Sequence, residues 1–192
     1  MIFLVIYIFL FFSCQENDVR MNVNSKMSFP NQVGDRWVYD VFDSTSLNSY
    51  DVTVTISTAT SVRNKIMNVW TFKYPTRLDT NYVTTNSDTI VFIAKDKTTV
   101  IDTYVLPLAA GSKWFGSWIF DIYSIPQRST VSVHGQSFEG SFNVKEIATS
   151  PNFRRSKDEW FTPYVGMVKK YRFEYAFSLP DNKVWYLKSW NL

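Results

Sequence analysis

The sequence predicts an all-β domain, built as an antiparallel sandwich, a barrel or a strongly curved sheet with little helix. Aromatic residues make up 18% of the 192-residue chain, and aromatic and β-branched residues favour strands. Apolar and polar residues alternate over many short stretches, whereas few stretches repeat with the period of a helix. Turn residues separate these stretches at short intervals, which is typical of antiparallel folds.

The chain begins with a predicted export signal at residues 1–13. Met1–Phe12 is an uninterrupted apolar run. It is shorter than the roughly 20 residues of a membrane-spanning helix and fits the apolar part of a secretory signal. Cys14, the only cysteine of the chain, follows Ser13, and the sequence FFSC at this point resembles the end of a bacterial lipoprotein signal. The resemblance implies cleavage before Cys14 and acylation of its thiol, and a plain signal peptide with a chance cysteine is the alternative.

Residues 14–28 are predicted to be a lipidated cysteine and a flexible tether. Gln15–Ser28 is rich in Asn, Ser and charged residues and shows no strand or helix period, as flexible linkers do. Acyl chains on Cys14 would hold the protein on a membrane, because each buried methylene contributes about 0.8 kcal/mol. The sequence QEND after the cysteine resembles the acidic export signals of Bacteroidetes surface lipoproteins. We therefore expect a lipid-anchored protein of the outer membrane, on its periplasmic side or on the cell surface.

Residues 29–192 are predicted to form a single β-rich domain, since their number lies within the usual size of one domain. With one cysteine the chain cannot form an internal disulfide, so its stability must come from packing. The net charge of +3 is small, and together with the predicted export it argues against a nucleic-acid partner.

Five strands are predicted in the first half of the domain. The clearest is Asp51–Ser57, in which Val52, Val54 and Ile56 would face the core while the residues between them face water. Lys95–Lys97 is a predicted charged turn. The five predicted strands are Arg36–Phe42, Asp51–Ser57, Lys65–Tyr74, Thr89–Ala94 and Thr98–Leu106.

Six strands are predicted in the second half. Pro180 and the Asx residues after it indicate a turn at Leu179–Asn182, between the last two strands. The six predicted strands are Ser117–Tyr123, Thr130–Val133, Ser137–Ile147, Glu159–Phe161, Val168–Phe177 and Lys183–Trp190.

Aromatic and charged residues alternate along the predicted strand Val168–Phe177. The aromatic set is Tyr171, Phe173, Tyr175 and Phe177, and the opposite set is Lys170, Arg172 and Glu174. Each ring can bury roughly 150–250 Å². The aromatic face is therefore predicted either to pack in the core or to form the wall of a groove for an apolar or sugar ligand.

One phrase occurs twice in the chain, as FPNQVGDRW at Phe29–Trp37 and as LPLAAGSKW at Leu106–Trp114. Each copy has a Pro that interrupts pairing, a Gly that tolerates positive φ, an Asp or Ser for turn hydrogen bonds, a basic residue and a Trp. We predict two comparable sheet corners, with each Trp starting a strand over an end of the core. A third relative, WFTPYVGMVK at Trp160–Lys169, is predicted to lead into a strand through Gly166.

These phrases also resemble a family. FPNQVGDRWVYD, LPLAAGSKW, GQSFEGSFNVKEI, WFTPYVGMVKKY and a closing WYLKSWNL are similar, in this order, to segments of uncharacterised Bacteroidetes lipoproteins with PLxVGNxW, aGxFxxV and W(Y/F)xPGVGLVK patterns. Tyr164 stands where that family commonly has Gly. The resemblance implies an exported β-rich domain and carries no catalytic residues. A more distant likeness to half-barrel lipoprotein carriers concerns architecture alone.

No catalytic, metal or cofactor site is predicted. His134, the only histidine, lies beside Gly135 in a predicted turn or strand end, whereas a Ser-His-Asp triad would have to use it. Zinc needs several His or Cys ligands, which this chain lacks. Asp158 and Glu159 are neighbours, and adjacent strand residues point to opposite faces, so they do not suit a carboxylate pair that cleaves glycosides.

Other charged residues lie within predicted strands or near the last hairpin. Asp40, Asp102 and Asp121 interrupt apolar strands and are the carboxylates best suited to burial, with exposure on a wet face as the alternative. Arg154–Lys157 and Lys169-Lys170 give a local basic excess. This excess is predicted to be either a solvated loop or a contact with anionic lipid headgroups or acidic glycans.

We expect a non-enzymatic, membrane-anchored lipoprotein of the cell envelope that binds an apolar or glycan ligand through aromatic rings. An alternative is a structural or accessory lipoprotein that binds another envelope protein through an exposed apolar patch or an unpaired strand edge. The predicted ligand-binding residues are Trp114, Trp118, Trp160, Tyr171, Phe173 and Tyr175.

Overall fold

The computed structural model describes residues 29–116, 121–150, 153–176 and 179–192. Cys14, the predicted tether and Trp118 lie outside these ranges. The described residues form strands, turns and bends without any helix, which confirms the predicted all-β class. Accordingly, the described part of the chain has no helix that is long and apolar enough to cross a membrane.

Thirteen strands are present in the described residues. The first six are β1 (Arg36–Asp43), β2 (Asn48–Val62), β3 (Lys65–Lys73), β4 (Leu78–Thr85), β5 (Thr89–Ile93) and β6 (Val100–Val105). The other seven are β7 (Lys113–Phe115), β8 (Asp121–Ser124), β9 (Arg128–Val133), β10 (Gln136–Ser150), β11 (Phe153–Thr162), β12 (Gly166–Ala176) and β13 (Leu179–Asn191).

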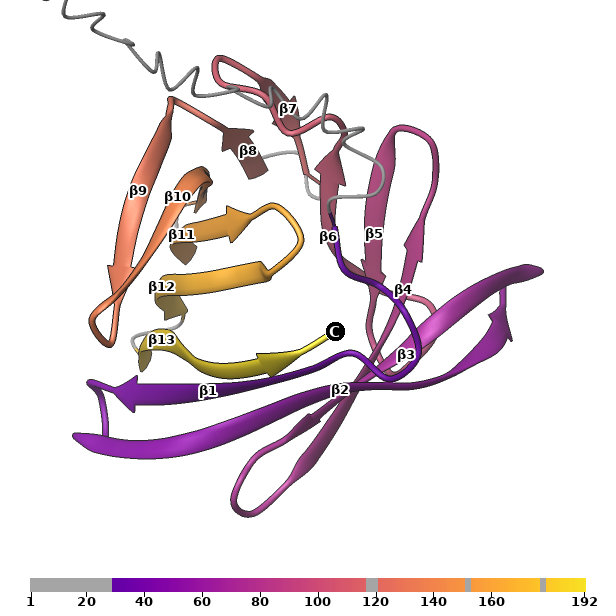
Figure 1. Cartoon of the computed structure of the whole chain (residues 1–192), viewed down its shortest axis with the longest axis horizontal. Coiled ribbons are helices and arrows are strands. Elements are labelled where there is room, and N and C mark those ends of the chain that lie inside the picture. The colour runs from indigo at the N-terminus through magenta and orange to yellow at the C-terminus, as the bar shows by residue number, and fades with distance from the viewer. Residues whose placement is uncertain (1–28, 117–120, 151–152, 177–178) are drawn as a thin grey trace, which may run out of the picture.

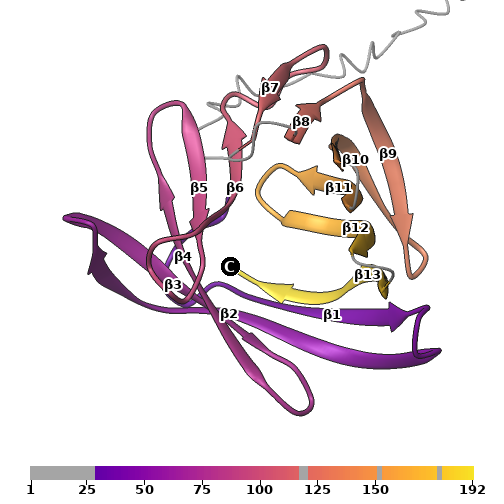
Figure 2. The same ribbon diagram turned by 180° about the vertical axis from the view of Figure 1, so that it is seen from behind.

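All of these strands belong to one antiparallel sheet that curls into a nearly closed barrel (Figure 1). The order is β6-β5-β4-β3-β2-β1-β13-β12-β11-β10-β8-β7, and β9 pairs with β10. Most neighbours are consecutive in the chain, so the sheet is largely a meander. The pairing of β1 with β13 places the first and last strands side by side, as the views from both sides show (Figure 2).

The barrel has a seam between β6 and β7, the two ends of the strand order, where no backbone ladder joins the described strands. Side chains bridge this seam. The indole Nε1 of Trp114 on β7 donates to the carbonyl of Thr103 on β6, at 2.8 Å. The hydroxyl of Tyr123 on β8 donates to the carboxylate of Asp102 on β6, at 2.7 Å. Polar side chains therefore do at the seam what backbone pairing does elsewhere.

The core lies inside the barrel and follows from the alternation of residues along the strands. Val52, Val54 and Ile56 of β2 are buried, whereas Thr53 and Thr55 between them are partly exposed, as predicted. Strand β9 and the first half of β10 pack further apolar residues into the same core. The buried residues of these two segments are Val131, Val133, Phe138 and Phe142.

The first copy of the repeated phrase forms a sheet corner. Gly34 has a φ of 107°; its N–H donates to the Ile56 carbonyl, and the N–H of Ile56 donates back to the Asp35 carbonyl, both at 2.9 Å. The Asp35 carboxylate accepts from the backbone N–H of Gln32 at 2.8 Å. Trp37 follows in β1 and is buried, so its ring lies over the core as predicted.

The second copy repeats these hydrogen bonds. Gly111 has a φ of 87°; its N–H donates to the Ile125 carbonyl at 2.6 Å, and the N–H of Ile125 donates to the Ser112 carbonyl at 2.9 Å. Two comparable corners are thereby confirmed. In the third phrase Gly166 has a φ of 93° and opens β12. Tyr164 has a φ of 64°, the conformation that Gly adopts most easily.

The structure corrects the sequence analysis at a predicted turn, at a predicted loop and at a strand that was not predicted. Leu179–Asn182 is not a turn but the beginning of β13, where Pro180 pairs with Tyr175; Pro is tolerated in the first residues of a strand. Strand β11 runs over Phe153–Thr162, so the basic stretch that it contains is strand and not loop. Strand β4 was not predicted, because its sequence LDTNYVTT carries little apolar alternation.

We predict that Gly34→Ala destabilises the domain by about 1–3 kcal/mol. A Cβ at this position would meet no atom within 4 Å, so the cost is that of holding a side chain at positive φ. Denaturant unfolding would measure the loss. Arg36→Ala, an exposed neighbour in the same corner, should change the free energy of unfolding by no more than about 0.5 kcal/mol. Equal losses in the two variants would contradict the conformational explanation.

Candidate functional site

The aromatic residues of β12 face outward, and the inside of the barrel is faced by charged residues of both strands, namely Arg155, Lys157 and Glu159 of β11 and Lys170, Arg172 and Glu174 of β12. Tyr171, Phe173 and Tyr175 are between 36% and 44% exposed, whereas Lys157 and Glu159 of β11 are buried. This exposure excludes the core, which was one of the two predicted positions of the aromatic set; Tyr171 and Phe173 instead line an outer cavity of about 130 Å³ together with Ser156 and Val184. Cross-strand pairing accounts for this orientation. The inward-facing charged residues of β11 and those of β12 include both signs, and their opposite charges meet inside the barrel.

Lys157 is the centre of the internal charge network. Its ammonium nitrogen lies 2.6 Å from Asp102 of β6, 2.8 Å from Glu146 of β10 and 3.4 Å from Glu159 on its own strand. Burial would lower the pKa of Lys157, but the three carboxylates, Asp102 first, outweigh it and raise the pKa well above its ordinary value. The side chain is therefore a permanent internal cation that ties three strands together.

Glu159 is held ionised in the same network. Lys170 of β12 lies 2.7 Å from one of its oxygens, and the hydroxyl of Tyr104 donates to the other at 2.6 Å. Burial alone would raise the pKa of Glu159, but Lys157, Lys170 and the Tyr104 hydrogen bond lower it to about 2. Burial and the nearby carboxylates raise the pKa of Tyr104, so this tyrosine stays protonated and keeps donating.

A second part of the network lies beyond Lys157 along the barrel. Arg155 contacts Glu146, and its guanidinium lies 3.2 Å from Asp121 of β8. Arg172 pairs with Glu174 within β12, and Lys183 pairs with Asp181 within β13. The side chain of Arg172 is 38% exposed and that of Asp181 is 39% exposed. The charges thus reach solvent at one end of the lumen.

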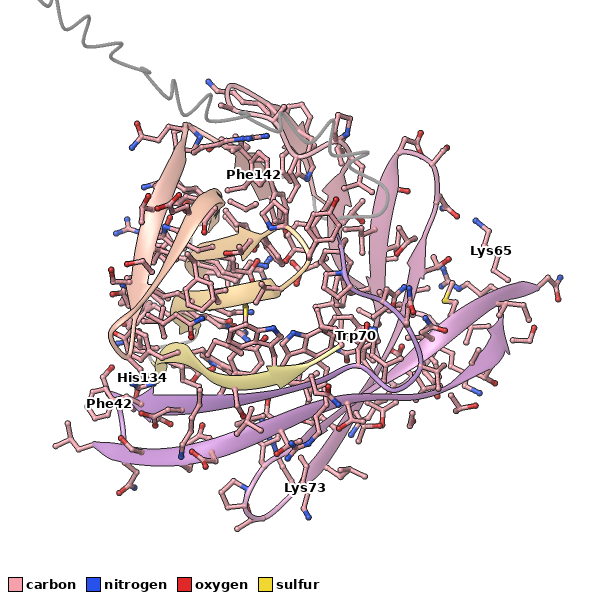
Figure 3. All side chains as sticks on the ribbon, in the orientation of Figure 1. Phe42, Lys65, Trp70, Lys73, His134 and Phe142 are labelled. Carbon is pink, nitrogen blue, oxygen red and sulfur yellow. The ribbon has the colours of Figure 1, made fainter. Side chains whose placement is uncertain are left out.

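Aromatic rings fill the other end. The indole of Trp70 on β3 stacks on Trp37 at 5.2 Å on one side and on Phe29 at 6.1 Å on the other. Phe29 also contacts Phe92 and Phe161, so the chain entering β1 closes this end of the barrel. Figure 3 shows Trp70 inside the curl of the sheet, while Lys65 and Lys73 of the same strand point away from it.

A cavity of about 400 Å³ lies between these two ends. Its apolar part is lined by Phe29, Trp37, Trp70, Phe92 and Phe161, whereas Trp185 lies beside its cross-strand partner Lys170. Its polar part is lined by Arg77, Asp79, Lys170, Arg172, Asp181 and Lys183. The lumen is therefore amphipathic along its length, which suits a ligand with an apolar chain and a polar group at one end.

The structure separates the predicted ligand-binding residues into two places. Trp160, Tyr171, Phe173 and Tyr175 lie together on the outside of β11 and β12. Trp114 stacks on Tyr123 at 5.4 Å, on the inward face beside the seam. Trp118 lies outside the described residues, as does the predicted lipidation site Cys14.

A lysine side chain already lies against some of the outward-facing rings. The ammonium of Lys169 lies 4.7 Å from the ring centre of Tyr171, 5.3 Å from that of Trp160 and 5.5 Å from that of Tyr186. Trp160 and Tyr171 meet edge to face at 5.4 Å. The lysine takes the place that an external cation would take in such a cluster.

Part of the signal for the charged lining of the lumen is present in the sequence. Lys170, Arg172 and Glu174 alternate with aromatic residues at the period of a strand, and Arg155, Lys157 and Glu159 have the same spacing, although the charged residues Arg154 and Asp158 lie on the other face. Single-sign series usually face water, but two series that carry both signs can neutralise each other between neighbouring strands. The register pairs Arg155 with Glu174 and Glu159 with Lys170.

The other residues that were considered as catalytic or metal-binding candidates do not lie together. His134 has a φ of 48° and sits exposed in the turn between β9 and β10, as predicted, and its ring contacts Tyr186. Asp158 faces outward beside Lys145 at 3.6 Å while Glu159 is buried, so the predicted opposition of these neighbours is confirmed. Within the described ranges no three His, Cys, Asp or Glu side chains are grouped to hold a metal ion.

Solved structures of other proteins have a similar architecture. The chain is similar to a "putative exported protein with YmcC-like fold" from Bacteroides fragilis, with a TM-score of 0.51 and 12% identity over 86% of this chain and 99% of that one. It is also similar to a "putative lipoprotein" from Parabacteroides distasonis, with a TM-score of 0.45 and 13% identity over 85% of this chain and 97% of that one. At these identities the likeness is one of fold. No family model and no curated protein matches the sequence.

We predict that Lys157→Met lowers the free energy of unfolding by about 3–5 kcal/mol, because it leaves the buried carboxylates of Glu146 and Glu159 and the partly buried one of Asp102 without their shared cation. Lys145→Met is the matched control. Lys145 forms a half-exposed pair with Asp158 on the outer face, so its loss should cost at most about 1 kcal/mol. Denaturant titration of both variants measures the difference, and similar losses would contradict the central role of Lys157.

Acid should weaken the fold through Glu159. Its pKa in the folded protein is about 2, against an ordinary value of 4.5. A lowered pKa contributes stability that is complete above about 4.5 and is lost as the pH falls toward 2. Unfolding free energies between pH 6 and pH 2 should therefore fall less steeply in Glu159→Gln than in the unaltered protein. The exposed Glu139→Gln should keep the original slope, and an unchanged slope in Glu159→Gln would contradict the prediction.

Proposed function

We propose that this protein is a membrane-anchored lipoprotein of the cell envelope that binds an amphipathic ligand, with an apolar chain and a polar headgroup, inside its barrel. The observation that carries the proposal is the cavity of about 400 Å³ with rings at one end and ion pairs at the other. Its volume lies within the range of pockets that bind small ligands.

The arrangement of the rings favours an apolar chain over a sugar. A sugar stacks on the open face of a ring, but both faces of Trp70 are covered, by Trp37 and by Phe29. Phe92 and Tyr104 meet their neighbours edge to face. A hydrocarbon chain does not need an open ring face, because its contacts with ring edges and aliphatic atoms are not directional.

The polar end of the cavity suits a charged headgroup. Arg77, Arg172 and Asp181 line the cavity with side chains that are each more than one-third exposed. Arg77 lies 3.1 Å from Asp79, and Arg172 contacts Glu174. These exposed pairs can exchange one partner for a ligand group at little cost, because exposed ion pairs contribute little to stability.

The predicted signal and Cys14 support the place of the protein in the envelope. Ser13 and Cys14 follow an apolar run that is too short to span a membrane. The fold of the described domain is also that of a protein described as exported. The proposed role needs no reaction, since the charged groups of the lumen are occupied with one another and His134 lies exposed in a turn.

A fluorescent fatty acid, dansyl-undecanoic acid, tests the proposal. We expect the purified protein to bind it with an increase in dansyl emission, and Phe92→Trp to weaken binding about tenfold. The larger ring would displace roughly two methylenes of the chain, at about 0.8 kcal/mol each. Phe173→Trp makes the same change on the outer face and should leave the affinity unaltered.

Two results would contradict the proposal. One is the absence of saturable binding, and the other is an equal effect of Phe92→Trp and Phe173→Trp on the affinity. If the intact protein bound another envelope protein and no amphiphile, the accessory role expected as the alternative from the sequence would replace the proposed one.

A further inference from the structure

The outward faces of β7, β8, β10, β11 and β12 form a continuous surface, which we call the outer wall. One row of cross-strand partners crosses all five strands, and its members are Phe115, Ile122, Ile147, Ser156 and Phe173. Four of the five are apolar, and they are well exposed: Phe115 75%, Ile147 59%, Ile122 49% and Phe173 41%. Soluble proteins seldom leave such a contiguous apolar strip uncovered.

The rows on either side add aromatic and basic residues. Lys145 of β10, Asp158 of β11 and Tyr171 of β12 are cross-strand partners in one flanking row. In the other, Arg154 of β11 pairs with Tyr175 of β12. The apolar strip is therefore bordered by tyrosine rings and by long cationic side chains.

The charge of the outer wall is positive. Its described cations are Lys113, Lys145, Arg154 and Lys169, and its described carboxylates are Glu139 and Asp158. The other basic residues of the sequence cluster, among them Arg155 and Lys157, point into the lumen and are neutralised there. The fold thus divides the basic excess, and the part that is left outside surrounds the apolar strip.

Protein–protein interfaces are depleted in lysine. Aromatic rings with polar tips, exposed aliphatic side chains and surrounding Lys and Arg are instead the composition of surfaces that lie at a membrane interface. Each such cation is attracted to the anionic headgroups of a bilayer. The composition of the outer wall therefore fits a lipid surface better than a protein.

The distance to a membrane is compatible with this contact. If Cys14 carries acyl chains, the segment between Cys14 and Phe29 allows at most about 50 Å between the bilayer and the first described residue when fully extended. A chain that behaves as a flexible linker spans about half of this distance on average. The domain is thus kept close to the bilayer, where weak surface contacts are populated.

We infer that the outer wall docks on the surface of a bilayer that carries anionic headgroups. The inference rests on the proposed lipid anchor for proximity, but the contact itself is made by the outer wall.

The test uses two cysteine variants of the full-length protein purified with its anchor, each labelled with an environment-sensitive dye. Ser156→Cys places the dye in the middle of the apolar strip, and Ser61→Cys places it on an exposed position of β2. Both proteins are mixed with vesicles of phosphatidylcholine alone or with added phosphatidylglycerol. Flotation measures anchoring, and the emission maximum measures contact with lipid.

We expect a blue shift at position 156 that occurs with phosphatidylglycerol, is absent at position 61 and is lost in 1 M salt, where screening is nearly complete beyond about 3 Å. The double variant Lys145→Glu and Arg154→Glu should lose the shift and keep its binding of dansyl-undecanoic acid in detergent. This second readout shows that the barrel is intact.

The remaining outcomes separate the two proposals. Flotation on both kinds of vesicle without any shift at position 156 would overturn docking and leave the anchor standing. An equal shift at positions 156 and 61, or a shift that appears with an added protein and not with lipid, would also overturn it. A shift at position 156 without flotation on neutral vesicles would support docking and contradict the anchor.

Discussion

The contact on which the structure depends is the set of ion pairs around the ammonium of Lys157. Three carboxylates from β6, β10 and β11 converge on this group. They can do so only if alternate residues of β11 and β12 face the inside of the barrel. A slip of one residue would turn every side chain of a strand to its other face. It would then expose this cation and bury the rings of Tyr171 and Phe173.

The same contacts also explain how a sheet with two free ends can form a barrel. The edge strand β6 reaches across the seam with Asp102, which forms an ion pair with Lys157 and accepts a hydrogen bond from the hydroxyl of Tyr123. Trp114 adds a hydrogen bond to the backbone of β6. A seam closed by side chains leaves the ends of the sheet less rigidly joined than a backbone ladder would. In the proposed function, this freedom would let a ligand enter the lumen.

The high aromatic content serves two different surfaces. Inside, the rings of Phe29, Trp37 and Trp70 form a stack that closes one end of the lumen. Outside, Tyr171 and Phe173 belong to a wall bordered by cations. On β12 the outer rings lie opposite Lys170, Arg172 and Glu174, so this strand turns a charged face to the interior and an aromatic face outward. This inversion of the usual arrangement is favourable only because the internal charges neutralise one another.

Much of the fold was determined by the sequence itself. The alternation in Asp51–Ser57 specified a half-buried strand, and the two Pro–Gly phrases specified corners with matching hydrogen bonds, because such signals act over a few residues. The sequence did not decide which face of β12 is inside. Both faces of that strand can be buried, one by apolar packing and the other by ion pairs, and the choice depends on Asp102 and Glu146, which are far from Arg172 in the chain. The lumen was not predicted for the same reason: it exists only once β6, β8 and β11 meet around one charged group.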